Sequence, residues 1–148
     1  MNLLEIGERQ MKKISITIPC YNEEENVYPL HDALVEMFER DLPNYEYELL
    51  YIDNCSSDRT RELLKELGKH FGQFNSPYYG MMQTTGDCTI LMAADFQDPV
   101  EMVPKYVAEW EKGYKIVIGR KTSSKESSIV YHLRSLYYKI IKKFSEVE

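Results

Sequence analysis

The sequence predicts an α/β fold in which helices cover a mostly parallel sheet. Short β-branched runs alternate with longer amphipathic stretches, which is the order that a parallel sheet with crossover helices requires. Residues 90–99 add a second observation, because an apolar run ends at Asp95 and is followed by Pro99, which opens a helix. A carboxylate directly after a buried strand lies at the carboxyl edge of the sheet, where α/β proteins bind ligands.

The first half of the chain contains two predicted strands and two predicted helices. Residues 14–19 are β-branched and form a short buried strand. Asn22 caps the next helix, which continues to a break at residues 42–44. Residues 47–52 form the second strand, and residues 60–67 form the second helix. The apolar stripe of the first helix consists of Val27, Leu30, Leu34, Met37 and Phe38.

The second half continues the same alternation of helices and strands. Pro99 stands at the first position of one of these helices, where its missing N–H is tolerated. The predicted elements are a short helix at residues 75–82, a strand at 88–92, a helix at 100–111, a strand at 114–118 and an amphipathic helix at 128–144.

The chain has 148 residues, which is enough for one domain with its own core. We expect a polar lead-in at residues 1–11, the domain at residues 12–122, and a linker with the amphipathic helix at residues 123–148. Three scattered cysteines indicate a reducing compartment. The sequence contains neither a signal-peptide pattern nor a run near the ~20 apolar residues that a membrane span needs.

Charge is divided unevenly along the chain. The net charge is −6, but residues 120–143 hold seven basic residues and one acid, so the remainder carries −12. This distribution indicates an anionic partner for the C-terminal segment and argues against a general nucleic-acid binder. The predicted helix at 128–144 combines an apolar stripe with tyrosines and basic residues. Such a helix either lies in a membrane interface or packs on the sheet, and both interpretations stand.

Three motifs follow predicted strands: PCYNEE at residues 19–24, DNCSSDRT at 53–60 and AADFQDP at 93–99. Together they resemble the P-x-Y-N-E-E, D-D-G-S-S-D-G-T and D-A-D-L-Q-D-P motifs of the family 2 glycosyltransferases of GT-A fold. The last form is typical of the branch that glycosylates polyprenyl phosphates. The resemblance covers roughly residues 12–145 and implies a single GT-A (Rossmann-like) domain that binds a nucleotide-diphosphate sugar.

The resemblance also implies residues that bind the sugar donor. Pro19, Tyr21 and Glu23 would line the base and ribose, and Asp53 would accept a hydrogen bond from the base. The alternatives are that Tyr21 packs in the core and that Asp53 caps a turn. Gly72, in an F-G-Q step, would let the backbone approach the donor.

Asp95 and Gln97 would bind Mg²⁺ or Mn²⁺ together with the donor's diphosphate, since carboxylate and amide oxygens suit hard cations. The sequence departs from the family pattern at Ala93, where the first acid of D-A-D is expected. Asp95 and Asp98 are the candidate catalytic carboxylates, although Asp98 also fits a helix cap. With one acid missing, the metal depends more on the donor's phosphates.

The resemblance implies a polyprenyl phosphate as acceptor, at the cytoplasmic face of the membrane. Its oxygen is already anionic at neutral pH, so it needs positioning and charge neutralisation more than a general base. Arg120 and Arg134 match arginines that hold the lipid phosphate in the mannose synthase branch. A solvated basic face is the alternative for both. The predicted reaction is sugar transfer with inversion at the anomeric carbon.

A different class of function also stands, namely a catalytically incomplete module that binds a nucleotide sugar or a lipid interface. Family members continue beyond the stretch that this sequence matches, and Ala93 removes an acid. A sugar nucleotidyltransferase is disfavoured, since the first strand end has no glycine-rich basic loop.

The stretch after the second predicted helix is too short for the usual third strand. Only three residues separate Gly68 from Gly72, and three residues reach at most ~10 Å. They would have to bring the chain back along a helix about 12 Å long. We therefore expect the third, edge strand to be missing. Either residues 60–80 are refolded locally, or residues have been removed from the chain here.

Overall fold

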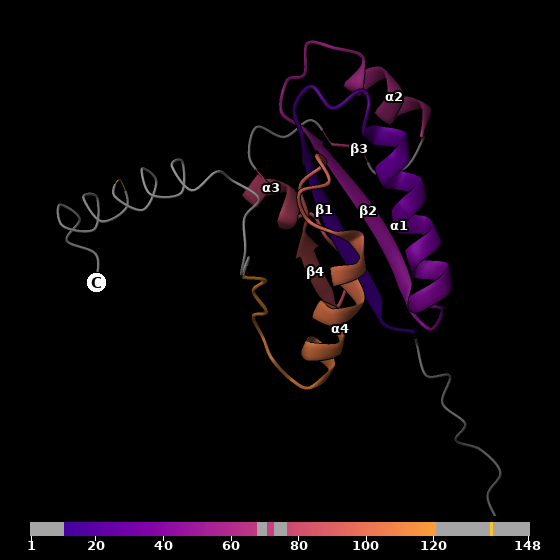
Figure 1. Cartoon of the computed structure of the whole chain (residues 1–148), viewed down its shortest axis with the longest axis vertical. Coiled ribbons are helices and arrows are strands. Elements are labelled where there is room, and N and C mark those ends of the chain that lie inside the picture. Colours follow the sequence, from indigo (N-terminus) through magenta and orange to yellow (C-terminus); the bar gives the residue numbers. More distant parts are fainter. Residues whose placement is uncertain (1–10, 68–70, 73–76, 121–136, 138–148) are drawn as a thin grey trace, which may run out of the picture. The chain divides into compact units, whose positions relative to one another are not determined.

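The structure is a computed structural model that describes residues 11–67, 71–72, 77–120 and 137. The chain divides into two compact units, Met1–Val117 and Ile118–Glu148. The first unit contains a four-stranded parallel sheet in the order β3-β2-β1-β4 (Figure 1). The predicted fold class, α/β with a mostly parallel sheet, is thereby confirmed.

Strands and helices alternate along the first unit, as the sequence pattern predicts. The strands are β1 (Lys13–Cys20), β2 (Glu46–Asp53), β3 (Phe71–Gly72) and β4 (Cys88–Leu91). The helices are α1 (Val27–Asp41), α2 (Thr60–Glu66), α3 (Pro77–Met81), the single 3₁₀ turn η1 (Val100–Met102) and α4 (Val103–Glu111).

The hydrophobic core lies between one face of the sheet and the helices α1, α2 and α4 (Figure 1). Alternate residues of β1 point into it, because successive side chains of a strand point to opposite faces. The predicted apolar stripe of α1 is buried along its whole length and packs on these strand residues. The strand residues Ile14, Ile16 and Ile18 and the helix residues Leu30 and Leu34 are completely buried.

The opposite face of the sheet carries polar side chains and α3. Ser15 is completely buried and donates a hydrogen bond of 2.6 Å to Oε1 of Glu48 on the neighbouring strand. The backbone N–H of Thr85 donates to the same oxygen at 2.6 Å. Gly80 of α3 packs so closely on Ile52 that an added Cβ would lie 2.1 Å from the Cδ1 of Ile52. A larger residue at position 80 would therefore require the Ile52 side chain to move.

The third strand is present but reduced to two residues. Phe71 and Gly72 pair with Tyr51 and Ile52 near the carboxyl end of β2. Our expectation that no strand has room here is therefore wrong, because the chain does regain the sheet edge. The shortness of the connection shows in the length of β3, since among the described residues only two positions of β2 pair with it.

Three local predictions differ from the structure. Asn22 does not cap α1, which begins after Asn26. Residues 114–118 form no strand, and their apolar side chains Ile116 and Ile118 are about 80% exposed. Pro99 precedes η1 in an extended conformation, with ψ of 132°, instead of being its first residue. For Asn22 the reason is a bond to another segment, since its side chain accepts from the Ser57 N–H. The predicted helix at 128–144 lies outside the described residues, apart from Tyr137.

Candidate active site

The carboxyl ends of the parallel strands meet at one edge of the sheet, and the loops that follow β1, β2 and β4 surround a hollow there. The hollow has a volume of about 190 Å³. Its lining comes from all three motif-bearing loops and consists of Pro19, Cys20, Tyr21, Glu23, Ile52, Asn54, Ala93, Ala94 and Asp95. Four predicted site residues therefore lie around one space, although the first and last motifs are far apart in the chain: Pro19, Tyr21, Glu23 and Asp95.

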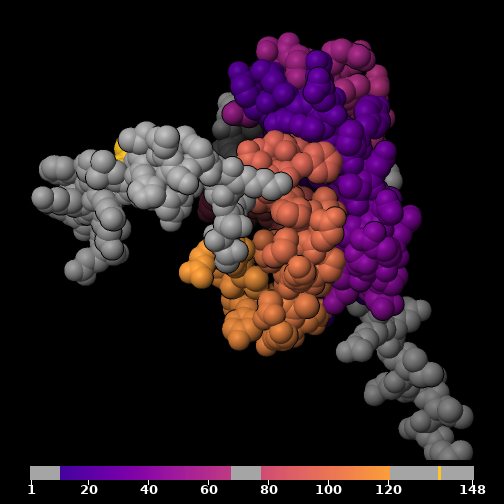
Figure 2. Space-filling model, viewed as in Figure 1, coloured from indigo at the N-terminus to yellow at the C-terminus, as the bar shows by residue number. Residues whose placement is uncertain are grey.

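Reciprocal hydrogen bonds join the loop after β1 to the loop after β2, and we call this set the interloop clasp. The Asn22 N–H donates to Ser56 Oγ at 2.9 Å, and the Ser57 N–H donates to Asn22 Oδ1 at 2.8 Å. The Arg59 N–H donates to Glu24 Oε2 at 3.0 Å. In Figure 2 the indigo and magenta surfaces of the two loops adjoin at the top of the molecule. The clasp holds both loops in one arrangement beside the hollow.

The remaining bonds of the clasp extend it to the start of α2. Asp58 accepts a hydrogen bond from the Glu24 N–H at 3.2 Å through one carboxylate oxygen. Its other oxygen accepts from the N–H of Thr60, the first residue of α2, at 3.0 Å. Thr60 is buried and its Oγ1 accepts from the Glu23 N–H at 2.7 Å. The Ser-Ser-Asp turn therefore bonds to the first residue of α2 and links the two loops at once.

Each of the three loops contains one non-glycine residue in the left-handed region. These residues are Asn22 (φ 56°), Cys55 (φ 59°) and Phe96 (φ 56°). A side chain in this region costs roughly 1–2 kcal/mol, with asparagine the best tolerated. Backbone strain of this kind gathers at functional sites and persists only where the surroundings enforce it.

Asp53 ends β2 and is completely buried. Its Oδ1 accepts a hydrogen bond from the Ser56 N–H at 3.1 Å. Its Oδ2 accepts from Nε and Nη2 of Arg61 at 3.1 and 3.0 Å. Burial alone would raise the pKa of Asp53, but the contacts with Ser56 and Arg61 outweigh it and hold that pKa below its usual value. Asp53 is thus a charged turn cap, the alternative that the sequence left open. Its hydrogen bond to a base stays a prediction.

Tyr21 and Glu23 differ in how firmly the protein holds them. Tyr21 is 59% exposed, so it does not pack in the core. Glu23 is half-buried, and its Oε2 accepts a hydrogen bond of 2.6 Å from the side-chain amide of Asn26. Burial raises the pKa of the neighbouring Cys20 thiol to about 12, so this cysteine stays neutral at physiological pH.

Asp95 and Gln97 lie on the loop that follows β4, and both are exposed. The Gln97 N–H donates to Asp95 Oδ1 at 3.0 Å, which folds the loop back on the carboxylate. Among the described residues, no three His, Cys, Asp or Glu side chains gather closely enough to hold a metal ion. Asp98 is half-buried, and in the described part of the chain it makes no hydrogen bond to the start of η1.

The other predicted site residues have different positions. Gly72 pairs with Ile52, one residue before Asp53, so it belongs to the same edge of the sheet. Arg120 is exposed and belongs to the second compact unit. Arg134 lies outside the described residues.

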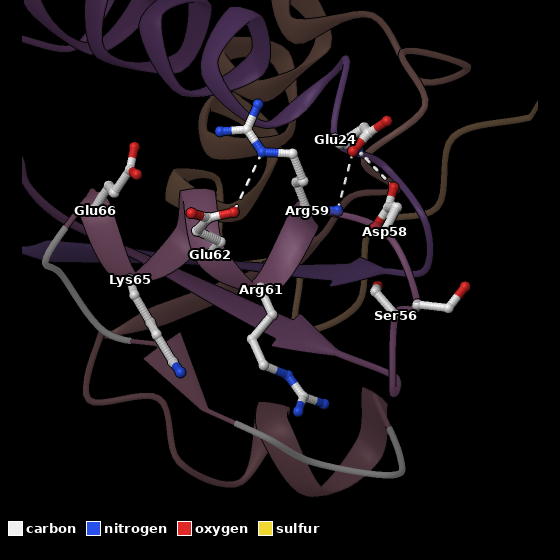
Figure 3. A pocket seen from close by; sticks show the side chains of 9 residues that line it. Glu24, Ser56, Asp58, Arg59, Arg61, Glu62, Lys65 and Glu66 are labelled. Carbon is white, nitrogen blue, oxygen red and sulfur yellow. Dashed lines mark hydrogen bonds and ion pairs between the residues drawn. The ribbon is translucent and has the colours of Figure 1, made fainter.

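A second, larger hollow of about 770 Å³ lies beside the interloop clasp and is lined mainly by α2 and the loop before it (Figure 3). Arg61 and Lys65 extend to one side of α2 in this view, and Arg59 and Glu62 extend to the other. Sequence reasoning did not single out Arg61. The sequence places Arg61 one residue after the DNCSSDRT motif, which is the one hint of a role that it contains. The contact with Asp53 depends on how α2 packs on β2.

Comparison with solved structures gives the same fold. The structure of S. aureus TarS 1–349 matches with a TM-score of 0.55 and 23% identity, over 77% of this chain and 40% of that one. Glucosyl-3-phosphoglycerate synthase from Mycobacterium tuberculosis, solved with Mn²⁺ and UDP, matches with a TM-score of 0.53 and 19% identity, over 67% and 39%. The chain therefore has the GT-A fold of glycosyltransferases.

Comparison of sequences identifies the family. The model of glycosyl transferase family 2 matches residues 15–147, and the chain belongs to this family. The bactoprenol glucosyl transferase of Shigella phage SfX is 30% identical over 146 residues, which is 90% of this chain and 47% of that protein. The undecaprenyl-phosphate 4-deoxy-4-formamido-L-arabinose transferase of Photorhabdus laumondii is 35% identical over 136 residues, or 80% and 40%. The chain spans less than half the length of these relatives.

Within the described part of the first and second units, no helix combines the length and apolarity needed to cross a bilayer.

Proposed function

We propose that this protein transfers a sugar from a nucleotide-diphosphate sugar to a polyprenyl phosphate, with inversion and with the help of Mg²⁺ or Mn²⁺. The observation that carries the proposal is the single hollow at the carboxyl edge, which three family motifs line together. The names of two relatives support the acceptor class, since they act on bactoprenol or undecaprenyl phosphate.

The donor would bind with its nucleotide against the loops after β1 and β2. Pro19, Tyr21 and Glu23 would line the base and ribose, because all three border the hollow and Tyr21 presents an exposed ring. Asp53 and Gly72 lie at the neighbouring strand ends. There Asp53 would accept a hydrogen bond from the base, and Gly72 would let the backbone approach the donor. The interloop clasp preorganises these groups before the donor arrives.

The diphosphate would lie near Asp95 and Gln97. Their carboxylate and amide oxygens are the ligands that Mg²⁺ and Mn²⁺ prefer, and both side chains are exposed. Two protein ligands leave most coordination positions to phosphate oxygens and water, which fits a cation that arrives with the donor. When bound, such an ion neutralises charge on the departing nucleotide diphosphate.

The transfer itself needs little acid–base chemistry from the protein. An oxygen of the acceptor phosphate attacks the anomeric carbon while the bond from that carbon to the diphosphate breaks, so the configuration inverts. Arg120 and Arg134 would hold the acceptor phosphate, because a guanidinium binds phosphate with two parallel hydrogen bonds. Asp98 would be the further catalytic carboxylate near the transferring sugar. The basic segment at residues 120–143 would keep the protein at an anionic membrane surface on the cytoplasmic side.

Replacement of Asp95 by Ala tests the proposal. Calorimetry with UDP and Mn²⁺ should show at least tenfold weaker binding for Asp95→Ala than for the wild type. The matched control is Glu101→Ala, an exposed acid six positions along that borders no hollow of the site, and it should bind as the wild type does. Equal affinity of Asp95→Ala and the wild type would exclude the assigned role.

Ala93 favours a second function, a module that binds the nucleotide sugar without catalysing transfer. Ala93 lines the hollow at a position where an acid would add a second anionic metal ligand. Turnover separates the two functions. Donor hydrolysis or a lipid-linked product in the presence of Mn²⁺ supports the enzyme, whereas donor binding without either product supports the module.

A further inference from the structure

Arg61 occupies an unusual position for a residue of a short surface helix. Its guanidinium donates two hydrogen bonds, of 3.1 and 3.0 Å, to a single oxygen of Asp53, which is eight residues earlier in the chain. The two side chains differ in exposure, since Asp53 is completely buried and Arg61 is 35% exposed. Arg61 therefore reaches from the helix to the end of the central strand and places its charge beside a carboxylate that water does not reach.

Asp53 in turn holds the loop that borders the donor hollow. Its other oxygen accepts the N–H of Ser56, which closes the turn after β2. Asn54 lies inside this turn, lines the hollow and donates its own N–H to the carbonyl of Cys20 at 2.9 Å. A chain of contacts thus runs from Arg61 through Asp53 to the residues that a donor nucleotide would touch.

We propose that Arg61 is a positioning residue of the donor site, which keeps Asp53 charged and thereby holds the loop 53–56 in its binding conformation. This inference rests on the proposed function, in which the hollow binds a nucleotide diphosphate. A buried carboxylate without a cation is costly, so it either takes up a proton or moves toward water. Either change would alter the turn that Ser56 and Asn54 belong to.

The charged groups near Asp53 show which residue can keep its carboxylate charged. The Asp53 carboxylate accepts from the Ser56 N–H and from the Arg61 guanidinium, and the Cys20 thiol on the paired position of β1 is the titratable group beside it. The acids of the clasp are Glu24, in the loop after β1, and Asp58, in the loop after β2, and both line the larger hollow. Lys65 stands one helical turn beyond Arg61 on the same side of α2 and is exposed (Figure 3). No ion pair links Lys65 to Asp53, so Lys65 is the matched cation with which to compare Arg61.

The test measures the affinity of the full chain for UDP with Mn²⁺ by calorimetry at pH 8 and pH 6. Arg61→Met should weaken binding at least tenfold at pH 6 and by a smaller factor at pH 8, because Asp53 without its cation takes up a proton as the pH falls. Arg61→Lys should restore the affinity to within about threefold of the wild type at both pH values. Lys65→Met should bind as the wild type does.

Three results decide between the explanations. Arg61→Met binding as tightly as Lys65→Met at both pH values would overturn the inference. An equal loss at both pH values, without rescue by Arg61→Lys, would also overturn it and indicate a purely structural role. Asp53→Asn carries no charge to balance, so Asp53→Asn/Arg61→Met gives a folded comparison if Arg61→Met alone is unstable. Its affinity relative to the wild type should be the same at both pH values. If the wild type binds none of UDP, GDP, CDP and dTDP in the presence of Mn²⁺, the proposed function fails instead.

Discussion

The interloop clasp depends on the side chain of Asn22, and Asn22→Ala is the sharpest test of it. The substitution removes the acceptor of two hydrogen bonds, from the Ser57 N–H at 2.8 Å and the Ser57 Oγ at 3.2 Å. It leaves the bond from the Asn22 N–H to Ser56 Oγ in place, because that donor belongs to the backbone. It also puts alanine at φ 56°, a conformation that asparagine tolerates better.

The expected loss of stability is about 2 kcal/mol. The hydrogen bonds contribute about 1 kcal/mol together, since the loop is exposed and water can replace part of them. The left-handed backbone adds about 1 kcal/mol for alanine. For a chain of 148 residues, this corresponds to a fall in Tm of roughly 6 °C.

Three variants at this position separate the two contributions. Asn22→Gly loses the hydrogen bonds but not the backbone preference, so it should lose about 1 kcal/mol. Asn22→Asp keeps an acceptor and should stay near the wild type. Urea unfolding followed by circular dichroism gives the free energies. A loss below about 0.5 kcal/mol for Asn22→Gly would refute the assignment of Asn22 to the clasp. Equal losses for the alanine and glycine variants would refute the contribution of the left-handed backbone.

Two further predictions concern the same edge and the sheet beneath it. Cys55 has φ 59°, so Cys55→Gly should change stability by less than about 1 kcal/mol. Cys55→Val should lose at least about 1 kcal/mol, because a β-branched side chain fits the left-handed region poorly. Thermal unfolding of both variants measures the difference. Burial raises the pKa of Glu48, but hydrogen bonds from Ser15 and Thr85 outweigh it and hold that pKa below its usual value. The stabilisation from this carboxylate is therefore complete above the unfolded-state pKa near 4.5 and is lost as the pH falls through the lower folded-state pKa. Below about pH 4.5 the Tm of the wild type should fall more steeply than that of Glu48→Gln, and parallel curves for the two proteins would contradict this account.

The sequence alone was sufficient for the fold class, the family and the loops that surround the site. Periodicity located the buried strands and the apolar stripe of α1, because one face of each element must be covered whatever its neighbours are. The parallel order of the strands then placed the three motifs at one edge. These properties depend on residues close together in the chain and on a general rule of sheet topology.

Only the tertiary structure decided how the edge is held together. Asn22 fits a helix cap by sequence, yet it bonds to Ser57 across the site. Asp53 finds its counter-charge in Arg61, and β3 keeps two residues beside β2. Each outcome depends on which backbone groups and charges of another segment lie within about 3 Å. A local sequence pattern does not determine such contacts.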